Sequence, residues 1–311
     1  MIKMVVLKEL STEELYIPGH RLCSGCGPST AMRMMMKVAG KNTIITTATG
    51  CIEVGTTYYP YTSWLVPWVH SAFENAAATA SGIEAAYKAM GRRSSKPRKV
   101  NIIAIGGDGG TFDIGIQALS GALERGHDFL YLCYDNEAYM NTGIQRSGAT
   151  PHGASTTTSW GGKKIPGKPE WKKDLIGISI AHGIDYAATA NIAYWNDFMT
   201  KVQKALEVEG PAVIHIIAPC PRGWRHEDKD TFKIARLATQ TRYFPVYEYD
   251  HGKYQINIKI PKPLPVIEYM KPQGRFKHLF KPEHSKELEL IQDRVDKNWG
   301  RLEKLCAMQN P

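Results

Sequence analysis

Residues 100–136 read VNIIAIGGDGGTFDIGIQALSGALERGHDFLYLCYDN and contain the clearest structural pattern in the chain. The apolar run from Val100 to Ile105 predicts a buried strand, and the glycine-rich turn after it leads into a helix predicted over residues 112–125. A second apolar run, residues 129–134, predicts another buried strand. A strand, a helix and a strand in this order form a βαβ unit, in which the two strands are parallel and joined by a right-handed crossover.

The same alternation continues on both sides of this unit. The sequence predicts helices over residues 29–38, 71–90, 175–182 and 196–207, and strands over residues 43–47, 186–189 and 212–218. Residues 144–174 lack a sustained period and predict a long loop, which in a compact domain is usually functional. The predicted fold is therefore an α/β protein with a doubly wound, mainly parallel sheet.

The segment after residue 249 has a different character. It contains a strand-like stretch over residues 254–260, three closely spaced prolines and a charged helix predicted over residues 282–306. We expect residues 1–249 to form the α/β domain that carries the functional sites. Residues 250–311 are predicted to form a peripheral arm that packs on a partner subunit.

Composition and charge narrow the functional classes. The 311 residues are 43% hydrophobic and 22% charged, which is typical of a folded globular protein. Lys and Arg number 39 against 30 Asp and Glu, so the net charge is 39 − 30 = +9, spread over short runs. This spread of charge favours a solvated basic surface over nucleic-acid binding. The positive charge could also serve to attract an acidic protein partner. With no membrane-length apolar stretch and no signal-peptide core, we expect a cytoplasmic protein without a membrane segment.

The turn at residues 106–110 is where a ligand is expected, because ligands of parallel sheets bind beyond the carboxyl ends of the strands. The dinucleotide fingerprint G-x-G-x-x-G fails there, since Phe112 occupies the third glycine position. A phosphate-binding loop at residues 162–168 also fails, because Pro169 stands where a Ser or Thr is required. Neither nucleotide-binding motif is therefore present, and the turn at residues 106–110 needs another explanation.

Asp108 in this turn and Asn136 after the next strand suggest a different ligand. A carboxylate and an amide oxygen at neighbouring strand ends suit Mg²⁺, which can bridge them to a diphosphate. The amino terminus of the following helix adds N–H groups and a favourable dipole for phosphate. This pattern resembles the thiamin diphosphate motif, which begins Gly-Asp-Gly and ends at Asn. A helix-capping Asp beside a turn Asn is the alternative without a ligand.

Six cysteines in a reducing compartment suggest metal or redox chemistry more than disulfides. Cys23 and Cys26 form a C-x-x-C pair, followed by Cys51 and, much later, by Cys220. Four thiolates can hold zinc or a [4Fe–4S] cluster. A zinc ribbon would normally show a second C-x-x-C, and a redox dithiol would leave Cys51 and Cys220 unexplained.

Six motifs, in order along the chain, resemble the β subunit of 2-oxoacid:ferredoxin oxidoreductases, most closely the pyruvate type. They are His20-Arg-Leu-Cys23-Ser-Gly-Cys26-Gly, Thr49-Gly-Cys51, His70-Ser-Ala-Phe73-Glu-Asn-Ala, Gly107-Asp108-Gly109, Asp135-Asn136-Glu-Ala-Tyr-Met-Asn141-Thr-Gly143 and Ala218-Pro-Cys220-Pro. The likeness extends from about residue 17 to residue 250. It implies a thiamin diphosphate-binding fold, with the diphosphate half of the thiamin site and a proximal cluster in residues 1–249.

The resemblance also implies roles for individual residues. By position, the [4Fe–4S] ligands would be Cys23, Cys26, Cys51 and Cys220. Mg²⁺ would be bound by Asp108, Asn136 and the backbone carbonyl of Ala138. Asn141 would face the thiazolium and the substrate as the catalytic residue. The other cofactor contacts would come from Cys51, Phe73, Gly107, Gly109 and Thr142.

The family resemblance implies that the chain is active only with other subunits. An α subunit would supply the pyrimidine side of the thiamin site, the activating Glu and the Arg that binds the substrate carboxylate. γ and δ subunits, or fused ferredoxin-like subunits, would pass electrons to ferredoxin. The expected reaction is oxidative decarboxylation of pyruvate to acetyl-CoA and CO₂. A branched-chain 2-oxoacid, 2-oxoglutarate, or oxalate without coenzyme A remain alternatives, as does a non-catalytic electron-transfer or zinc-stabilised structural subunit.

Overall fold

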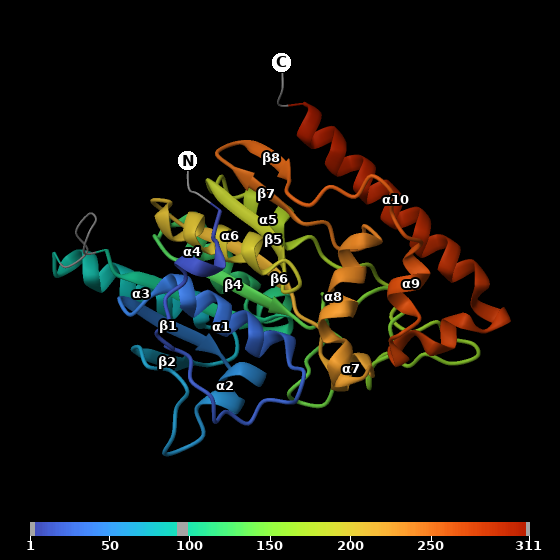
Figure 1. Ribbon diagram of the computed structural model, residues 1–311, viewed down its shortest axis with the longest axis horizontal. Helices are drawn as coiled ribbons and strands as arrows, with labels where there is room; N and C mark the ends of the chain where they lie inside the picture. The colour runs from blue at the N-terminus through green and yellow to red at the C-terminus, as the bar shows by residue number, and fades with distance from the viewer. Residues whose placement is uncertain (1–3, 92–98, 309–311) are drawn as a thin grey trace.

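The computed structural model describes residues 4–91 and 99–308 of the chain (Figure 1). Its centre is a sheet with the strand order β2-β1-β3-β4-β6-β5-β7-β8. The strands are β1 (Thr43–Ala48), β2 (Trp68–Ser71), β3 (Asn101–Gly107), β4 (Leu130–Asp135), β5 (Tyr186–Asn191), β6 (Ala212–Ile217), β7 (Tyr247–Asp250) and β8 (Lys253–Ile256). The first six strands in this order, from β2 through β5, run parallel to one another. Strands β7 and β8 are added antiparallel at one edge. The predicted doubly wound, mainly parallel sheet is therefore confirmed.

Helices cover both faces of the sheet. The α-helices are α1 (Gly27–Ala39), α2 (Cys51–Thr56), α3 (Ala76–Ala89), α4 (Ile116–Glu124), α5 (Leu175–Ile180), α6 (Trp195–Glu207), α7 (Pro221–Trp224), α8 (Thr231–Gln240), α9 (Val266–Met270) and α10 (Ser285–Ala307). Strand β3 shows how the two layers share the sheet: Ile103 and Ile105 pack with α1 and α6, whereas Ile102 and Ala104 pack with α3 and α4. Because successive side chains of a strand point to opposite faces, one apolar strand supplies both cores.

Shorter turns complete the chain. They are the 3₁₀ turns η1 (Leu7–Glu9), η3 (Asp228–Asp230), η4 (Gly274–Phe280) and η5 (Pro282–His284), and the π-helical turn η2 (Gly109–Asp113). The π-helical turn and α4 replace the single helix predicted over residues 112–125. The break comes at Gly115, where a Cβ would lie 2.1 Å from the carbonyl oxygen of Gly110.

The helix predicted over residues 71–90 begins later than expected. Ser71 ends strand β2, where it pairs with Ala48 of β1, and α3 starts only at Ala76. Residues 144–174 contain neither helix nor strand, as predicted, and their chain is folded against the sheet and the C-terminal elements.

The C-terminal segment contributes to the same body as the rest of the chain. Strands β7 and β8 join the central sheet, and α9, η4 and α10 bury a third apolar cluster against α7, α8 and the long loop. In Figure 1, α10 runs along the outer side of these elements. Its buried positions Ile291, Val295, Trp299 and Leu302 recur every three or four residues, so one stripe of the helix faces the cluster.

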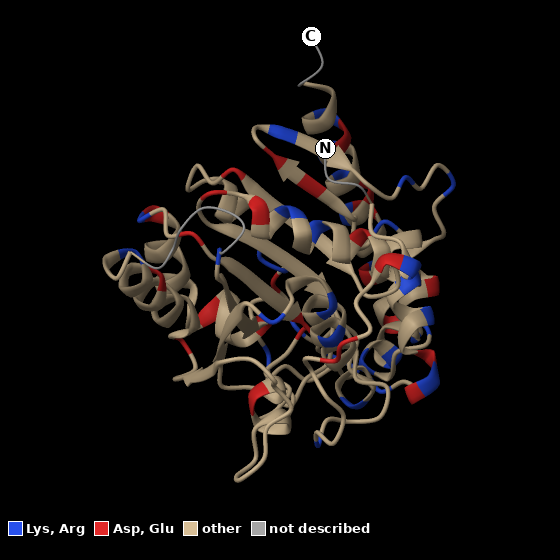
Figure 2. Cartoon of the chain, turned by 60° about the vertical axis from the view of Figure 1, so that its left-hand side comes forward, with Lys and Arg blue, Asp and Glu red and all other residues tan. Residues whose placement is uncertain are grey.

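Charged residues of both signs occur along the outer helices and loops, while the central strands carry few (Figure 2). Among residues 4–91 and 99–308, no helix has the length and apolar character needed to cross a membrane.

Candidate functional site

A pocket lies at the carboxyl ends of β1, β3 and β4, the edge where parallel sheets bind ligands. Every residue predicted to contact thiamin diphosphate or Mg²⁺ lines it: Cys51, Phe73, Gly107, Asp108, Gly109, Asn136, Ala138, Asn141 and Thr142. Six further residues complete the lining: Thr49, Gly50, Gly110, Tyr134, Tyr139 and Met140. Except for Gly110 and Tyr134, these further residues lie within the quoted motifs. The motifs therefore pointed to this part of the chain, although we assigned none of the six a role.

Three polar groups converge in this pocket. The carboxamide end of Asn136 lies 2.9 Å from the carbonyl oxygen of Ala138 and 3.0 Å from Oδ1 of Asp108. If the amide turns its nitrogen toward them, it donates a hydrogen bond to both. If it turns its oxygen instead, the three groups form an all-oxygen set of the kind that Mg²⁺ prefers. The donor set therefore fits a hard cation.

Asp108 is almost wholly inaccessible to solvent, at 1% exposure, and its Oδ2 accepts a hydrogen bond from the Ser147 hydroxyl at 2.5 Å. Burial raises the pKa of Asp108 well above its ordinary value, and the nearby charge of Asp135 raises it further. A bound cation would offset this cost of burying a negative charge.

Gly109 is required by the close approach of an aromatic ring. A Cβ at this position would lie 2.5 Å from the ring of Tyr139. Tyr139 in turn stacks on Phe73, with ring centroids 5.6 Å apart and an interplanar angle of 14°. Since all three residues line the pocket, any side chain at position 109 would push these rings out of their present places.

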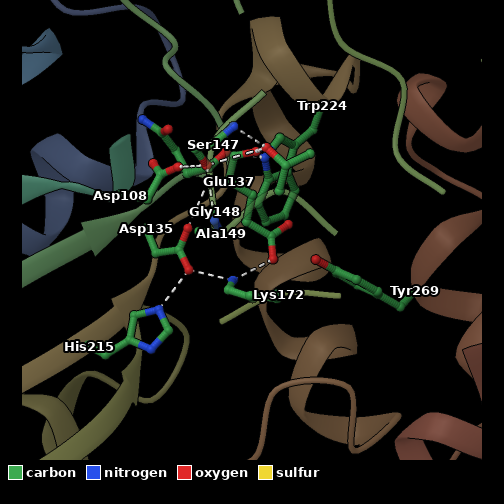
Figure 3. A network of polar contacts seen from close by, with 12 residues as sticks. Asp108, Asp135, Glu137, Ser147, Gly148, Ala149, Lys172, His215, Trp224 and Tyr269 are labelled. Carbon is green, nitrogen blue, oxygen red and sulfur yellow. Dashed lines mark hydrogen bonds and ion pairs between the residues drawn. The ribbon is translucent and has the colours of Figure 1, made fainter. Parts of the chain in front are cut away.

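The turn that carries Asn136 is held by a buried polar network (Figure 3). Asp135 and Glu137, on either side of Asn136, are 0% and 1% exposed. Lys172 forms ion pairs with both of them, and His215 Nε2 lies 2.6 Å from Asp135 Oδ2. Burial opposes ionisation of Asp135, but Lys172 and His215 outweigh it and lower its pKa to about 2. Asp135 and Glu137 lie within a quoted motif, but the sequence analysis gave them no role. Nothing in the local pattern marks Lys172 as a partner of this turn.

The four predicted cluster cysteines lie together at one side of the pocket. The main chains of three segments meet there: Arg21 N donates to Gly55 O at 2.7 Å, and Gly27 N donates to Pro219 O at 3.1 Å. Burial raises the pKa of Cys51, and Cys220, Cys26 and Cys23 each raise it further, as neighbouring like charges do. The same mutual effect links Cys26 to Cys220 and Cys23, and Cys220 to Cys23.

These thiols are available for a ligand. All four are free, and Cys23 is exposed while the other three are partly buried. Among the described residues, no three His, Cys, Asp or Glu side chains are close enough to hold a single metal ion. A [4Fe–4S] cubane is larger than one ion and spreads its four sulfur ligands more widely than a zinc ion does.

Cys51 belongs to both groups of residues, because it lines the pocket and also interacts with the other three thiols. Met140 makes a second link: it lines the pocket, and its sulfur packs against Gly223 in the turn after Cys220. The oxygen-lined and sulfur-lined groups are therefore adjacent.

A second, larger cavity lies between α10 and the sheet. It is bordered by Lys172, His215 and Trp171, and by the side of α10 that includes Arg294 and Arg301. None of the residues predicted from the motifs lines it, so it is separate from the chemistry predicted above.

Comparison with known proteins gives a consistent family assignment. Residues 48–216 match the thiamine pyrophosphate enzyme, C-terminal TPP binding domain. The chain is 56% identical to pyruvate synthase subunit PorB of Methanocaldococcus jannaschii, over 94% of this chain and 97% of that protein. It is 48% identical to ketoisovalerate oxidoreductase subunit VorB of Pyrococcus abyssi, over 96% of each.

The fold is shared with a solved 2-oxoglutarate:ferredoxin oxidoreductase from Magnetococcus marinus, at a TM-score of 0.51 and 20% identity. That match covers 74% of this chain and 79% of the other. The sequence matches are far closer and extend over nearly the whole chain. This chain therefore belongs to the family of β subunits of thiamin diphosphate-dependent 2-oxoacid:ferredoxin oxidoreductases, which work together with partner subunits.

Proposed function

We propose that this chain is the β subunit of a pyruvate:ferredoxin oxidoreductase and holds both Mg²⁺–thiamin diphosphate and a [4Fe–4S] cluster. The observation that carries the proposal is the double role of Cys51, which lines the cofactor pocket and neighbours three more thiols. When bound, thiamin diphosphate supplies the means to cleave the bond between the carboxylate and the carbonyl of a 2-oxoacid, and the cluster accepts single electrons.

In this proposal the chain's own residues bind the metal and the cofactor and contact the substrate. Asp108, Asn136 and the Ala138 carbonyl would hold Mg²⁺, which would supply the positive charge that binds the diphosphate at the strand ends. Phe73 and Tyr139 border the cofactor, and Gly107 and Gly109 lie beside it in the pocket lining, where a Cβ would meet the rings of Tyr134 and Tyr139. Asn141 and Thr142 lie on the same wall of the pocket, and Asn141 is the residue that we assign to substrate contact.

The four thiolates would hold the cluster, which would accept single electrons. Because Cys51 also lines the cofactor pocket, the cluster would be held next to that pocket. Cys23 is exposed, so its side of the cluster site would be accessible to the subunit that carries electrons onward to ferredoxin.

Pyruvate is the proposed substrate because relatives named pyruvate synthase reach 56% identity. A branched-chain 2-oxoacid is the second candidate, since relatives named ketoisovalerate oxidoreductase reach 48%. The activating Glu and the substrate-binding Arg are proposed to lie on the α subunit, with coenzyme A taking the acyl group.

The test of the substrate is turnover by the complete complex, purified without oxygen. Pyruvate, 2-oxoisovalerate, 2-oxoglutarate and oxalate are compared, each with and without coenzyme A, with reduction of ferredoxin as the readout. We expect the highest kcat/KM with pyruvate, and only in the presence of coenzyme A. A preference for any other acid contradicts the substrate assignment, and turnover of oxalate without coenzyme A would point to a different reaction.

The test of the cluster is the metal content of cysteine variants of the complex. Cys220→Ser is expected to remove about four irons per copy of this chain and the matching absorption near ~400 nm, as loss of one cubane predicts. Cys306→Ser is the matched control, because Cys306 lies on α10, away from the other cysteines, and should leave iron unchanged. Iron loss in both variants or in neither, or one zinc per chain, would overturn the cluster assignment.

A further inference from the structure

Asn136 and Ala138, the two proposed metal ligands that come from one turn, can face Asp108 only if that turn keeps an uncommon shape. Glu137 between them has a positive φ of 65°, a left-handed conformation that non-glycine residues adopt only when their surroundings enforce it. Because the turn is short, a small change at residue 137 would move both ligands.

Hydrogen bonds to the backbone of the turn provide part of the force that holds Glu137 in this conformation. The Asp135 carboxylate accepts from the N–H of Glu137 at 2.9 Å. Trp224 Nε1 donates to the carbonyl of Asn136 at 2.7 Å, and the Thr150 hydroxyl donates to the carbonyl of Glu137 at 2.7 Å. The carbonyl of Ala138 is left to face the amide of Asn136 in the pocket.

The rest comes from two cations far from the turn in sequence, of which Arg275 is buried and Lys172 is partly buried. Lys172, at the end of the long loop, contacts both carboxylates and lies 2.8 Å from Glu137 Oε1. Arg275, in the C-terminal η4 turn, donates from Nη2 to Glu137 Oε2 at 2.5 Å. Asp135 and Glu137 are thus matched by two positive charges in a buried space.

Arg275 is itself held firmly. It is 2% exposed, its guanidinium lies 3.9 Å above the centre of the Trp224 ring, and its Nε donates to Gln273 at 2.8 Å. The residue that fixes the carbonyl of Asn136, Trp224, is therefore packed under the residue that fixes Glu137. Loop 144–174, α7 and the C-terminal segment all converge on this one turn.

We propose that Lys172 and Arg275 are positioning residues that hold Asn136 and Ala138 in metal-binding geometry, so that the C-terminal segment is a working part of the cofactor site. This inference rests on the proposed function, because it presumes that the turn binds Mg²⁺. Buried ion pairs contribute little to net stability but are costly to break on one side, which suits a role in fixing geometry.

The experiment measures the Mg²⁺ concentration that gives half-maximal binding of thiamin diphosphate to the complex after both have been dialysed away. Arg275→Met is expected to raise this concentration about 10- to 100-fold, the usual effect of losing a residue that orients metal ligands. Mn²⁺ in place of Mg²⁺ adds a second readout, because its paramagnetic resonance spectrum reports the arrangement of the ligands.

Two further variants separate positioning from simple loss of stability. Glu137→Gln combined with Arg275→Met removes both charges, so it should restore most of the melting temperature and still bind Mg²⁺ weakly. Lys201→Met is the matched control, because Lys201, like Arg275, is a buried cation paired with a carboxylate, in this case Asp197 at 2.8 Å on helix α6. It should lower the melting temperature but leave the half-maximal Mg²⁺ concentration within about twofold of wild type, since Lys201 contacts none of the metal ligands.

The outcomes are distinguishable. Wild-type Mg²⁺ affinity and an unchanged Mn²⁺ spectrum in the double variant would overturn the positioning role, as would an equal loss of affinity in Lys201→Met. If wild-type complex binds thiamin diphosphate without any need for a divalent cation, the proposed function itself fails, and this inference fails with it.

Discussion

At the scale of single residues, Asp108 supplies the one carboxylate in the group of three proposed metal ligands. Its Oδ1 is the atom nearest the Asn136 amide, and its Oδ2 is held by Ser147. An amide at this position would keep the size of the side chain but lose the charge that binds a divalent cation. The site therefore depends on the charge of Asp108 and not on its volume.

We accordingly expect Asp108→Asn to weaken Mg²⁺-dependent binding of thiamin diphosphate at least about tenfold while leaving iron content unchanged, because a single charged ligand is lost. Isothermal titration of the complex checks this. Asp174→Asn is the control, since Asp174 caps helix α5 by accepting from Gly177 N at 2.9 Å and does not line the pocket. Retained affinity in Asp108→Asn would show that Asp108 is not a ligand.

At the scale of secondary-structure elements, strand β7 is attached to the parallel sheet through Glu248. This side chain is 2% exposed and accepts hydrogen bonds from Tyr186 on β5, Lys204 on α6 and Asn257, at 2.8 to 2.9 Å. Burial opposes its ionisation, but these donors outweigh burial and hold the pKa of Glu248 below its ordinary value. The charged form is thus part of what holds the antiparallel edge in place.

Glu248→Gln should lower the free energy of unfolding by about 1–3 kcal/mol at pH 7, the usual cost of disturbing charged hydrogen bonds in a buried place. A group with a depressed folded-state pKa stabilises the protein above its unfolded pKa and loses that effect as pH falls through the folded value. The difference in melting temperature between variant and wild type should therefore stay constant from pH 7 down to about pH 4.5 and shrink only as the pH falls below that value. Asp250→Asn, on the same strand but more exposed, should change the melting temperature less; an equal effect would contradict the assignment to Glu248.

At the scale of the whole molecule, the C-terminal segment has two faces. One side of α10 is buried against the chain, while Lys286, Lys297 and Lys304 on the same helix are exposed. The buried side belongs to the cluster that surrounds Arg275 and the cofactor turn. The exposed side is the surface where the predicted packing of residues 250–311 on a partner subunit would take place.

Cross-linking of the complete complex tests that packing. We expect a lysine-reactive cross-linker to join Lys286, Lys297 or Lys304 to residues of other subunits, because an arm that docks on a partner brings these amines within reach of it. Modification of the exposed Lys41 and Lys88 by one end of the cross-linker is the control, because it shows that the reagent reached the chain. Cross-links from the three arm lysines only to this same chain would contradict the docking.

Local patterns were sufficient for the central part of the fold. The apolar runs of β3 and β4 and the glycine turn between them predicted the parallel strands, because a strand buried on both faces reads as a continuous apolar run. Short or polar elements were harder: β2 and β7 were not predicted, since four residues with mixed polarity give no clear period. Their pairing depends on neighbours distant in sequence, such as Ile45 with Trp68 and Ala188 with Glu248.

The sequence by itself determined the positions on which the proposed chemistry rests, because residue types and their places at strand ends are local properties: Asp108 and Asn136 follow two adjacent strands, and the cysteine motifs flank other elements. Only the tertiary structure decided what holds that chemistry in place. Lys172 and Arg275 contact Asp135 and Glu137, which lie 35 to 138 residues away in sequence. The hydrophobic periods of strands and helices carry no information about such distant contacts. Buried charges find partners through the packing of the finished molecule, so their pairing became visible only there.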